Sequence, residues 1–264
     1  MIEIIRFIIV GAVQGIAEFL PISSSGHLVL IPYIFHWDYQ GLSFDIALHF
    51  GTLIAILVYF WKDWVLLFKN AFTKGPTEEY PRNLLWQIAV ATIPAGIAGV
   101  LLSKYEETIF RSPLLIASNL IVFGLVLWAV DKYSKKKLIL TELTYLRSFF
   151  LGCAQAIALI PGVSRSGITI TAGRLIGLNR KNAARFSFLL STPAILGAFV
   201  LSAKDLATSD LNLAFYLGVL SSTIFGFIAI RYLLKYLEKS DFKLFVWYRI
   251  LIGLLIFGIY FANR

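Results

Sequence analysis

Charged residues are scarce in this sequence. Asp, Glu, Lys and Arg make up 15% of its 264 residues, whereas soluble domains carry roughly 25%. Hydrophobic residues make up 58%, and the mean hydropathy is +0.78. This balance excludes an ordinary soluble domain and predicts an integral membrane protein.

Several other features are missing. The single cysteine, Cys153, excludes an internal disulfide. The sequence has neither a Gly-rich nucleotide loop nor a metal-ligating Cys/His cluster. Its N-terminus lacks a basic n-region and a small-residue cleavage site, so we do not expect a cleaved signal. The basic residues that give the net charge of +9 occur in short clusters between apolar runs. That distribution is typical of cytoplasmic loops, and we therefore expect no nucleic-acid partner.

Six apolar runs are long enough to cross a bilayer core, which takes roughly 20 helical residues. They lie at about 42–61, 84–103, 113–130, 186–203, 213–230 and 244–262. Two pairs of shorter pieces, 4–20 with 28–37 and 145–160 with 167–178, flank turns rich in Pro, Ser and Gly. We predict that each pair is a re-entrant helix–loop–helix hairpin, because broken backbone at membrane depth must be buried in protein or line a wet cavity.

The charges of the loops predict the orientation. Segments 62–82, 131–147 and 231–243 hold 4, 5 and 4 Lys and Arg residues, against 2 in 104–112 and 1 in 203–211. The first three segments are therefore expected inside the cell. Each half then has three spans, and an odd number forces the halves into opposite orientations. The sequence predicts an all-α integral membrane protein, an inverted-topology repeat with six transmembrane helices and two re-entrant hairpins. It forms a single membrane domain, 1–264, with repeats 1–137 and 138–264.

An internal repeat coincides with the two short pairs. Gly11 to His27 reads GAVQGIAEFLPISSSGH, and Gly152 to Gly167 reads GCAQAIALIPGVSRSG. Identical residues recur at an offset of 141, among them Gly11/Gly152, Gln14/Gln155, Ser23/Ser164, Ser25/Ser166 and Gly26/Gly167. The copies differ in charge, because Glu18 and His27 occur only in the first and Arg165 stands opposite Ser24. If the two turns meet, they form one asymmetric site.

Glu18 is an ionisable residue inside an apolar helix, which makes it a functional candidate by default. The alternative is that Glu18 serves only as an ion-pair staple for Arg165. Gln14 lies four residues before Glu18, on the same helical face. Asp45 and His49 are also four apart, and they either lie near the site or face a wet crevice.

The two turns suit a phosphate. The stretch Ser23-Ser24-Ser25-Gly26 offers hydroxyls and backbone N–H groups next to a helix start, although Ser is also a preferred helix cap. The box PGVSRSGIT, Pro161 to Thr169, adds Arg165, whose planar fork matches phosphate oxygens. The alternative for Arg165 is a side chain that snorkels to a membrane interface.

With EFLPISSSGH and PGVSRSGIT, the chain resembles the bacterial undecaprenyl pyrophosphate phosphatase family of the bacitracin-resistance type over nearly its whole length. The likeness includes the pair Gln14/Glu18, the turn Ser23 to His27 and the FSFLLSTP run, Phe186 to Pro193. It implies hydrolysis of C55 undecaprenyl diphosphate to the monophosphate, which recycles the lipid carrier for peptidoglycan synthesis. It also implies a multi-pass protein of the bacterial cell (inner) membrane whose active site opens to the outer, periplasmic side.

The resemblance assigns roles to the motif residues. The expected catalytic residues are Glu18, Ser24, His27 and Arg165. The expected phosphate-binding residues are Ser23, Ser25, Gly26, Ser164, Ser166, Gly167 and Thr169. A divalent cation, Mg²⁺ or Ca²⁺, is expected at Gln14 and Glu18, although Gln14 stands where some members have Glu, and a neutral amide is a weaker ligand.

Two questions of mechanism stay open at this point. By analogy with the family Ser24 attacks the terminal phosphorus, with His27 as its base or as the acid for the leaving group, but direct attack by water is the alternative. The rival function is a transporter of anionic lipid or phosphate, because inverted repeats with broken helices are transporter architecture. Flipping of the lipid product besides its hydrolysis also stays open. The expected partners are the lipid substrate, membrane lipids and, as an assembly, a homodimer.

Overall fold

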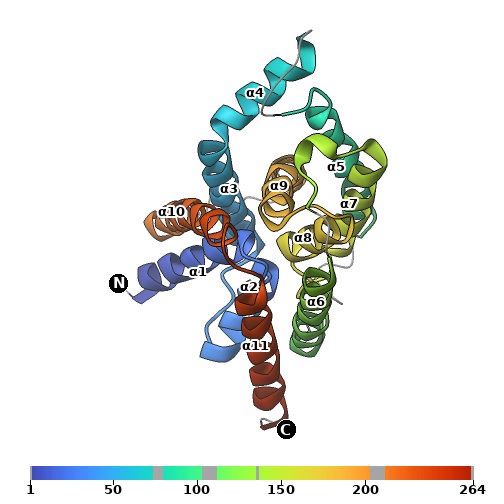
Figure 1. Ribbon diagram of the computed structural model, residues 1–264. Helices are drawn as coiled ribbons and strands as arrows, with labels where there is room; N and C mark the ends of the chain where they lie inside the picture. Colours follow the sequence, from blue (N-terminus) through green and yellow to red (C-terminus); the bar gives the residue numbers. More distant parts are fainter. Residues whose placement is uncertain (1, 74–79, 103–111, 135–136, 203–211, 263–264) are drawn as a thin grey trace.

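The computed structural model describes residues 2–73, 80–102, 112–134, 137–202 and 212–262 (Figure 1). Helices make up most of these residues. They are α1 (Ile2–Phe19), α2 (Ser24–Phe35), α3 (Leu42–Tyr59), α4 (Trp61–Phe72), α5 (Leu84–Leu102), α6 (Pro113–Tyr133), α7 (Tyr145–Ile157), α8 (Arg165–Leu175), α9 (Arg180–Ser202), α10 (Leu213–Tyr236) and α11 (Lys243–Ala262), with a short 3-10 turn at Leu140–Glu142. The described part of the chain contains no strand, only an isolated bridge between Leu138 and Leu178.

Six of these helices, α3, α5, α6, α9, α10 and α11, are long and apolar enough to cross a membrane. They match the six predicted apolar runs, and each half of the chain contributes three. The prediction of an all-α multi-pass membrane protein is confirmed.

Two helix–turn–helix pairs, α1 with α2 and α7 with α8, carry the repeated sequence. Helices α2, α7 and α8 have 12, 13 and 11 residues. At 1.5 Å per residue they are about 16–20 Å long, shorter than the hydrocarbon core of about 30 Å. Their lengths suit hairpins that enter the membrane and return, and the re-entrant path itself stays a prediction.

The two halves of the chain exchange packing partners. Helix α1 of the first half packs along α10 of the second, and α7 of the second half packs along α5 of the first. The first spans of each half, α3 and α9, contact each other, and so do the last spans, α6 and α11 (Figure 1). Corresponding helices thus find corresponding partners, which is the arrangement that an approximate two-fold axis between the halves produces.

Glycines allow the exchanged pairs to pack backbone to backbone. A Cβ on Gly11 of α1 would lie 2.1 Å from the carbonyl oxygen of Gly218 on α10. A Cβ on the equivalent Gly152 of α7 would lie 2.3 Å from the carbonyl oxygen of Ala91 on α5. Small residues at such crossings replace the hydrophobic driving force that lipid does not supply.

The structure adds details to the predicted elements. Helix α4 was not predicted as an element of its own within 62–82, and it is held by an ion pair between Asp63 and Arg185 of α9. Helices α2 and α8 begin at Ser24 and Arg165, earlier than the predicted residues 28 and 167, because Ser23 and Ser164 cap them. The connections 104–112 and 203–211, and residues 135–136 of the basic stretch, lie outside the described residues except for Ser112.

The close helix crossings predict the effect of adding a single methyl group. Gly11→Ala and Gly152→Ala should each destabilise the protein by about 1–3 kcal/mol, because the added Cβ meets backbone that cannot yield. Gly96→Ala is the matched control on α5, since no atom lies within 4 Å of its Cβ position. Thermal unfolding in detergent measures the difference, and equal melting temperatures for all three variants would contradict the packing.

Candidate active site

The two repeated turns have the same backbone conformation. Ser23 has φ 75° and ψ 92°, and Ser164 has φ 75° and ψ 114°. Left-handed φ is uncommon for a residue other than glycine and often marks a functional site. Each serine caps the helix that follows: Ser23 Oγ accepts from the N–H of Gly26 at 3.3 Å, and Ser164 Oγ accepts from the N–H of Gly167 at 3.1 Å. The repeated sequence therefore specifies a repeated turn.

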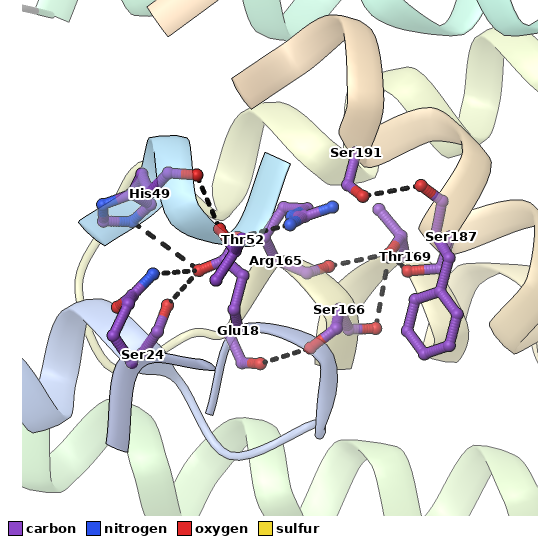
Figure 2. A network of polar contacts seen from close by, with 12 residues as sticks. Glu18, Ser24, His49, Thr52, Arg165, Ser166, Thr169, Ser187 and Ser191 are labelled. Atoms are coloured by element: carbon purple, nitrogen blue, oxygen red, sulfur yellow. Dashed lines mark hydrogen bonds and ion pairs between the residues drawn. The ribbon is translucent and has the colours of Figure 1, made fainter. Parts of the chain in front are cut away.

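The turns meet at the interface between the two halves. The N–H of Gly162 donates to Ser23 Oγ at 3.2 Å, and Ser166 Oγ donates to the carbonyl of Leu20 at 2.9 Å. The guanidinium of Arg165 pairs with the carboxylate of Glu18 (Figure 2). The carboxylate of the first copy and the guanidinium of the second thus form a single asymmetric site.

Glu18 is the centre of this site. Its carboxylate is 6% exposed, and Oε2 accepts from Ser24 Oγ at 2.5 Å and from Gln14 Nε2 at 3.0 Å. His49 Nε2 lies 3.6 Å from the same oxygen, while Arg165 contacts Oε1 (Figure 2). Glu18 does pair with Arg165, as a staple would, but it also engages three further polar side chains.

His49 and Asp45, four residues apart on α3, have different partners. His49 lies beside the Glu18 carboxylate, with a side chain that is 33% exposed. Asp45 instead accepts from the hydroxyl of Tyr39 at 2.8 Å. Of the pair, His49 is the residue that reaches the site.

His27 has two partners of its own. Its Nδ1 lies 2.7 Å from the carbonyl oxygen of Ser23, and its Nε2 lies 2.7 Å from the hydroxyl of Tyr248 on α11. A carbonyl only accepts, so Nδ1 carries a proton. Among the contacts of the described residues no hydrogen bond joins His27 to Ser24, whose hydroxyl turns to Glu18 instead. The expected imidazole–hydroxyl pair is therefore absent from this geometry.

The remaining hydroxyls of the motifs support the turns. Ser25 and Ser23 have their Oγ atoms 3.5 Å apart, and Ser164 and Ser166 have theirs 3.2 Å apart. Thr169 Oγ1 donates to the carbonyl of Arg165 and lies 2.6 Å from Ser187 Oγ of α9 (Figure 2). Ser187 belongs to the FSFLLSTP run. Thr169 is buried and holds the main chain of Arg165 in place.

Two buried polar atoms at the site have no hydrogen-bond partner in the described part of the chain. They are Nη1 of Arg165, a donor, and Oε1 of Gln14, an acceptor. A buried unsatisfied group costs free energy until a ligand pairs with it. The donor fits a phosphate oxygen, and the acceptor fits a cation.

These residues fit a divalent cation held jointly with substrate. No group of three or more His, Cys, Asp and Glu side chains suited to a metal occurs in the described ranges. Mg²⁺, however, is commonly bound by one or two carboxylates together with substrate phosphates. Glu18 and the open Oε1 of Gln14 supply that kind of partial oxygen set.

Tyr248 and its neighbour Arg249 were missed from the sequence. Both lie in an apolar span, α11, far along the chain from the turns. The available signal was Arg249 itself, because an ionisable residue within a span is a functional candidate by default.

Comparison with known proteins shows the family of this chain. Residues 7–255 match the family described as bacitracin resistance protein BacA. A relative from Pelotomaculum thermopropionicum is 49% identical over 251 residues, covering 95% of this chain and 94% of its own. One from Moorella thermoacetica is 48% identical over 261 residues, covering 99% of both chains. A third, from Elusimicrobium minutum, is 49% identical over 252 residues, covering 96% of both. All three are named undecaprenyl-diphosphatase. With the match extending over both turns and nearly all of the helices, the chain belongs to the bacitracin resistance protein BacA family.

Proposed function

We propose that this protein is a membrane phosphatase that hydrolyses undecaprenyl diphosphate to undecaprenyl monophosphate and phosphate, and so recycles the lipid carrier for peptidoglycan synthesis. The names and full-length similarity of its relatives support this function. The observation that carries it is the contact of Ser24 Oγ with Glu18 Oε2 at 2.5 Å, beside Arg165. A nucleophile next to a base, with a phosphate-binding fork across from it, is an arrangement suited to phosphoryl transfer.

In the proposed reaction Ser24 Oγ attacks the terminal phosphorus of the diphosphate. The bond from that phosphorus to the bridging oxygen breaks, undecaprenyl monophosphate leaves, and the proton of Ser24 passes to Glu18. Water then attacks the phosphoserine, releases phosphate and restores the Ser24 hydroxyl. Attack by water in the first step, with no phosphoserine, is the alternative.

Arg165 would make Glu18 a better base when substrate binds. Its Nη1 has no hydrogen-bond partner among the described residues, so this donor can bind a phosphate oxygen. When the guanidinium turns towards the phosphates, Glu18 loses its strongest partner and its affinity for a proton rises. Both ring nitrogens of His27 are engaged in this geometry, Nδ1 with the Ser23 carbonyl and Nε2 with the Tyr248 hydroxyl. To act as acid for the leaving oxygen, His27 would have to take up a second proton at Nε2 and exchange the Tyr248 contact for that oxygen.

A divalent cation, when bound, would neutralise charge on the phosphates. We propose that Glu18 and Gln14 hold it together with the substrate. Gln14 also donates to Glu18 at 3.0 Å, so the amide keeps the carboxylate oriented while its Oε1 faces the cation.

The orientation of the protein is a further part of the proposal. From the charge of the basic connections we propose that the α6–α7 segment lies inside the cell and the α2–α3 connection, 36–41, outside. His49 of α3, which lies beside Glu18 with a side chain that is 33% exposed, follows a short way after that connection. This exposure supports a site that opens to the outer side of the membrane. A homodimer stays a prediction.

Phosphate release from a C55 diphosphate by purified protein in detergent tests the function. We expect stoichiometric release of phosphate and monophosphate. A protein that only transports its ligand would release none, and that result would replace the phosphatase with the transporter.

The nucleophile is tested by the three adjacent serines. Ser24→Ala should abolish phosphate release, because it removes the hydroxyl bound to Glu18. Ser25→Ala should cost less, since its hydroxyl has only the 3.5 Å contact with Ser23. Ser23→Ala should lower stability by about 1 kcal/mol through loss of the cap. If Ser24→Ala keeps a tenth of normal turnover, direct attack by water is the better mechanism.

The cation is tested by its removal and by changing Gln14. EDTA should stop phosphate release, and added Mg²⁺ or Ca²⁺ should restore it. Gln14→Glu supplies a second carboxylate and should lower the cation concentration needed for half-maximal activity, whereas Gln14→Ala should raise it. Activity that survives exhaustive chelation would remove the cation from the proposal.

Thiol labelling tests the orientation. Cys153→Ser first removes the native thiol. Single cysteines are then introduced at the exposed positions Ser112 and Lys137, which the predicted topology puts on opposite sides of the membrane. An impermeant thiol reagent added to sealed cells should label Ser112→Cys but not Lys137→Cys. Labelling of Lys137→Cys alone would reverse the orientation, and labelling of both would contradict the inverted repeat.

A further inference from the structure

Arg249 is the largest fully buried side chain of the described protein, with an exposure of 0%. It lies near the start of α11, within an apolar span. A charged side chain in such a position is costly and is retained where it has a task. Its task can be read from its partners.

The guanidinium of Arg249 donates only to main-chain carbonyls, and they belong to three segments. Nη1 donates to Pro21 in the first turn at 3.2 Å. Nη2 donates to Gly162 and Val163 in the second turn at 2.9 and 3.0 Å. Nε donates to Leu120 of α6 at 2.9 Å, and Nη2 also reaches the carbonyl of Asn119 at 3.2 Å. One side chain therefore joins both halves of the active site to the two last spans.

Four other arginines behave differently. Arg165, Arg174, Arg180 and Arg185 each pair with a carboxylate. No ion pair of Arg249 is found among the described residues. Its five carbonyl bonds occupy its Nε, Nη1 and Nη2 atoms, so it holds the turns and does not replace Arg165 at the substrate.

Two glycines leave room for this side chain. A Cβ on Gly167, in the first turn of α8, would lie 2.9 Å from Nη1 of Arg249. A Cβ on Gly124 of α6 would lie 3.4–3.6 Å from Cβ, Nε and Cδ of Arg249. The guanidinium is thus enclosed by α6, α8 and both turns, and cannot shift without moving one of them.

We propose that Arg249 is a positioning residue of the reaction, which fixes the turn carrying Ser24 relative to the turn carrying Arg165. The proposal rests on the phosphatase function. Ser24 and Arg165 lie on different halves of the chain, and their alignment determines whether nucleophile and phosphate meet in line. A misplacement of about 1 Å at a reacting centre costs on the order of 10²-fold in rate. The donors of Arg249 are bonded to main-chain carbonyls, so its loss changes the alignment of the turns rather than a substrate contact, and it falls on kcat more than on KM.

The test compares Arg249→Lys with Arg174→Lys in the purified full chain. Lysine keeps the charge but cannot bridge three segments, so Arg249→Lys should lower kcat by about 10–100-fold, as the loss of a supporting contact does, with KM changed less than threefold. Arg174 is also buried, and it donates to Asp131 and to the carbonyls of Leu178 and Ser134, away from the turns. Arg174→Lys should lower the melting temperature and keep the kcat of the folded protein.

If Arg249→Lys does not fold, a second pair of variants tests the proposal. The Cβ of Gly124→Ala would make only ordinary contacts with Arg249. The larger side chain of Gly124→Val would press on the Arg249 side chain from α6, while the sequence of both turns stays unchanged. We expect near-normal kcat for the first and a clear loss for the second. Normal kcat in Arg249→Lys or Gly124→Val, or equal losses in Arg249→Lys and Arg174→Lys, would overturn the proposal. Phosphate release by the unaltered protein separates these outcomes from failure of the phosphatase function itself.

Discussion

The pairing of Glu18 with Arg165 is the interaction on which the rest of the site depends. Each of these charges alone would be costly at membrane depth, and together they neutralise each other across the interface between the halves. The pairing has a consequence for chemistry. Arg165 keeps one donor open while it holds Glu18, so an arriving phosphate competes with the carboxylate for the same guanidinium. In the proposed reaction, substrate binding and activation of Glu18 are therefore one event, and before it Arg165 and Glu18 compensate each other's charge.

The repeat explains how an asymmetric site arises on a symmetric frame. Ser23 and Ser164 have the same left-handed backbone and cap their helices in the same way, and Gly11 and Gly152 make equivalent close crossings. These positions build the turns and tolerate little change in either copy. The positions between them are free to differ, and there one copy supplies Ser24 while the other supplies Arg165.

Local sequence signals predicted much of this arrangement. Apolar length gave the six spans, and the Pro-Ser-Gly turns gave the two short helix pairs. The 141-residue offset indicated which side chains stand at equivalent positions, and the structure brings Glu18, Ser24 and Arg165 together. The partners of His27 could not be predicted in this way. Tyr248 lies 221 residues further along the chain, and helical periodicity indicates a face of α11 but not which turn that face meets. The same limit applies to the contact of His49 with Glu18, which depends on how α3 packs against α1.

Arg249 shows why a site made from two broken helices needs support from outside the repeat. Where a helix ends inside the protein, its last carbonyls and those of the following turn lack water, and each must find a donor. Pro21, Gly162 and Val163 supply such carbonyls, and a single guanidinium satisfies all three. An amide or hydroxyl could bond one turn, but only a side chain with several donors in a fixed fork bonds both at once and so sets the distance between them. Arg249 thus bonds the free carbonyls of the broken helices and, by the same contacts, aligns the two turns for the reaction.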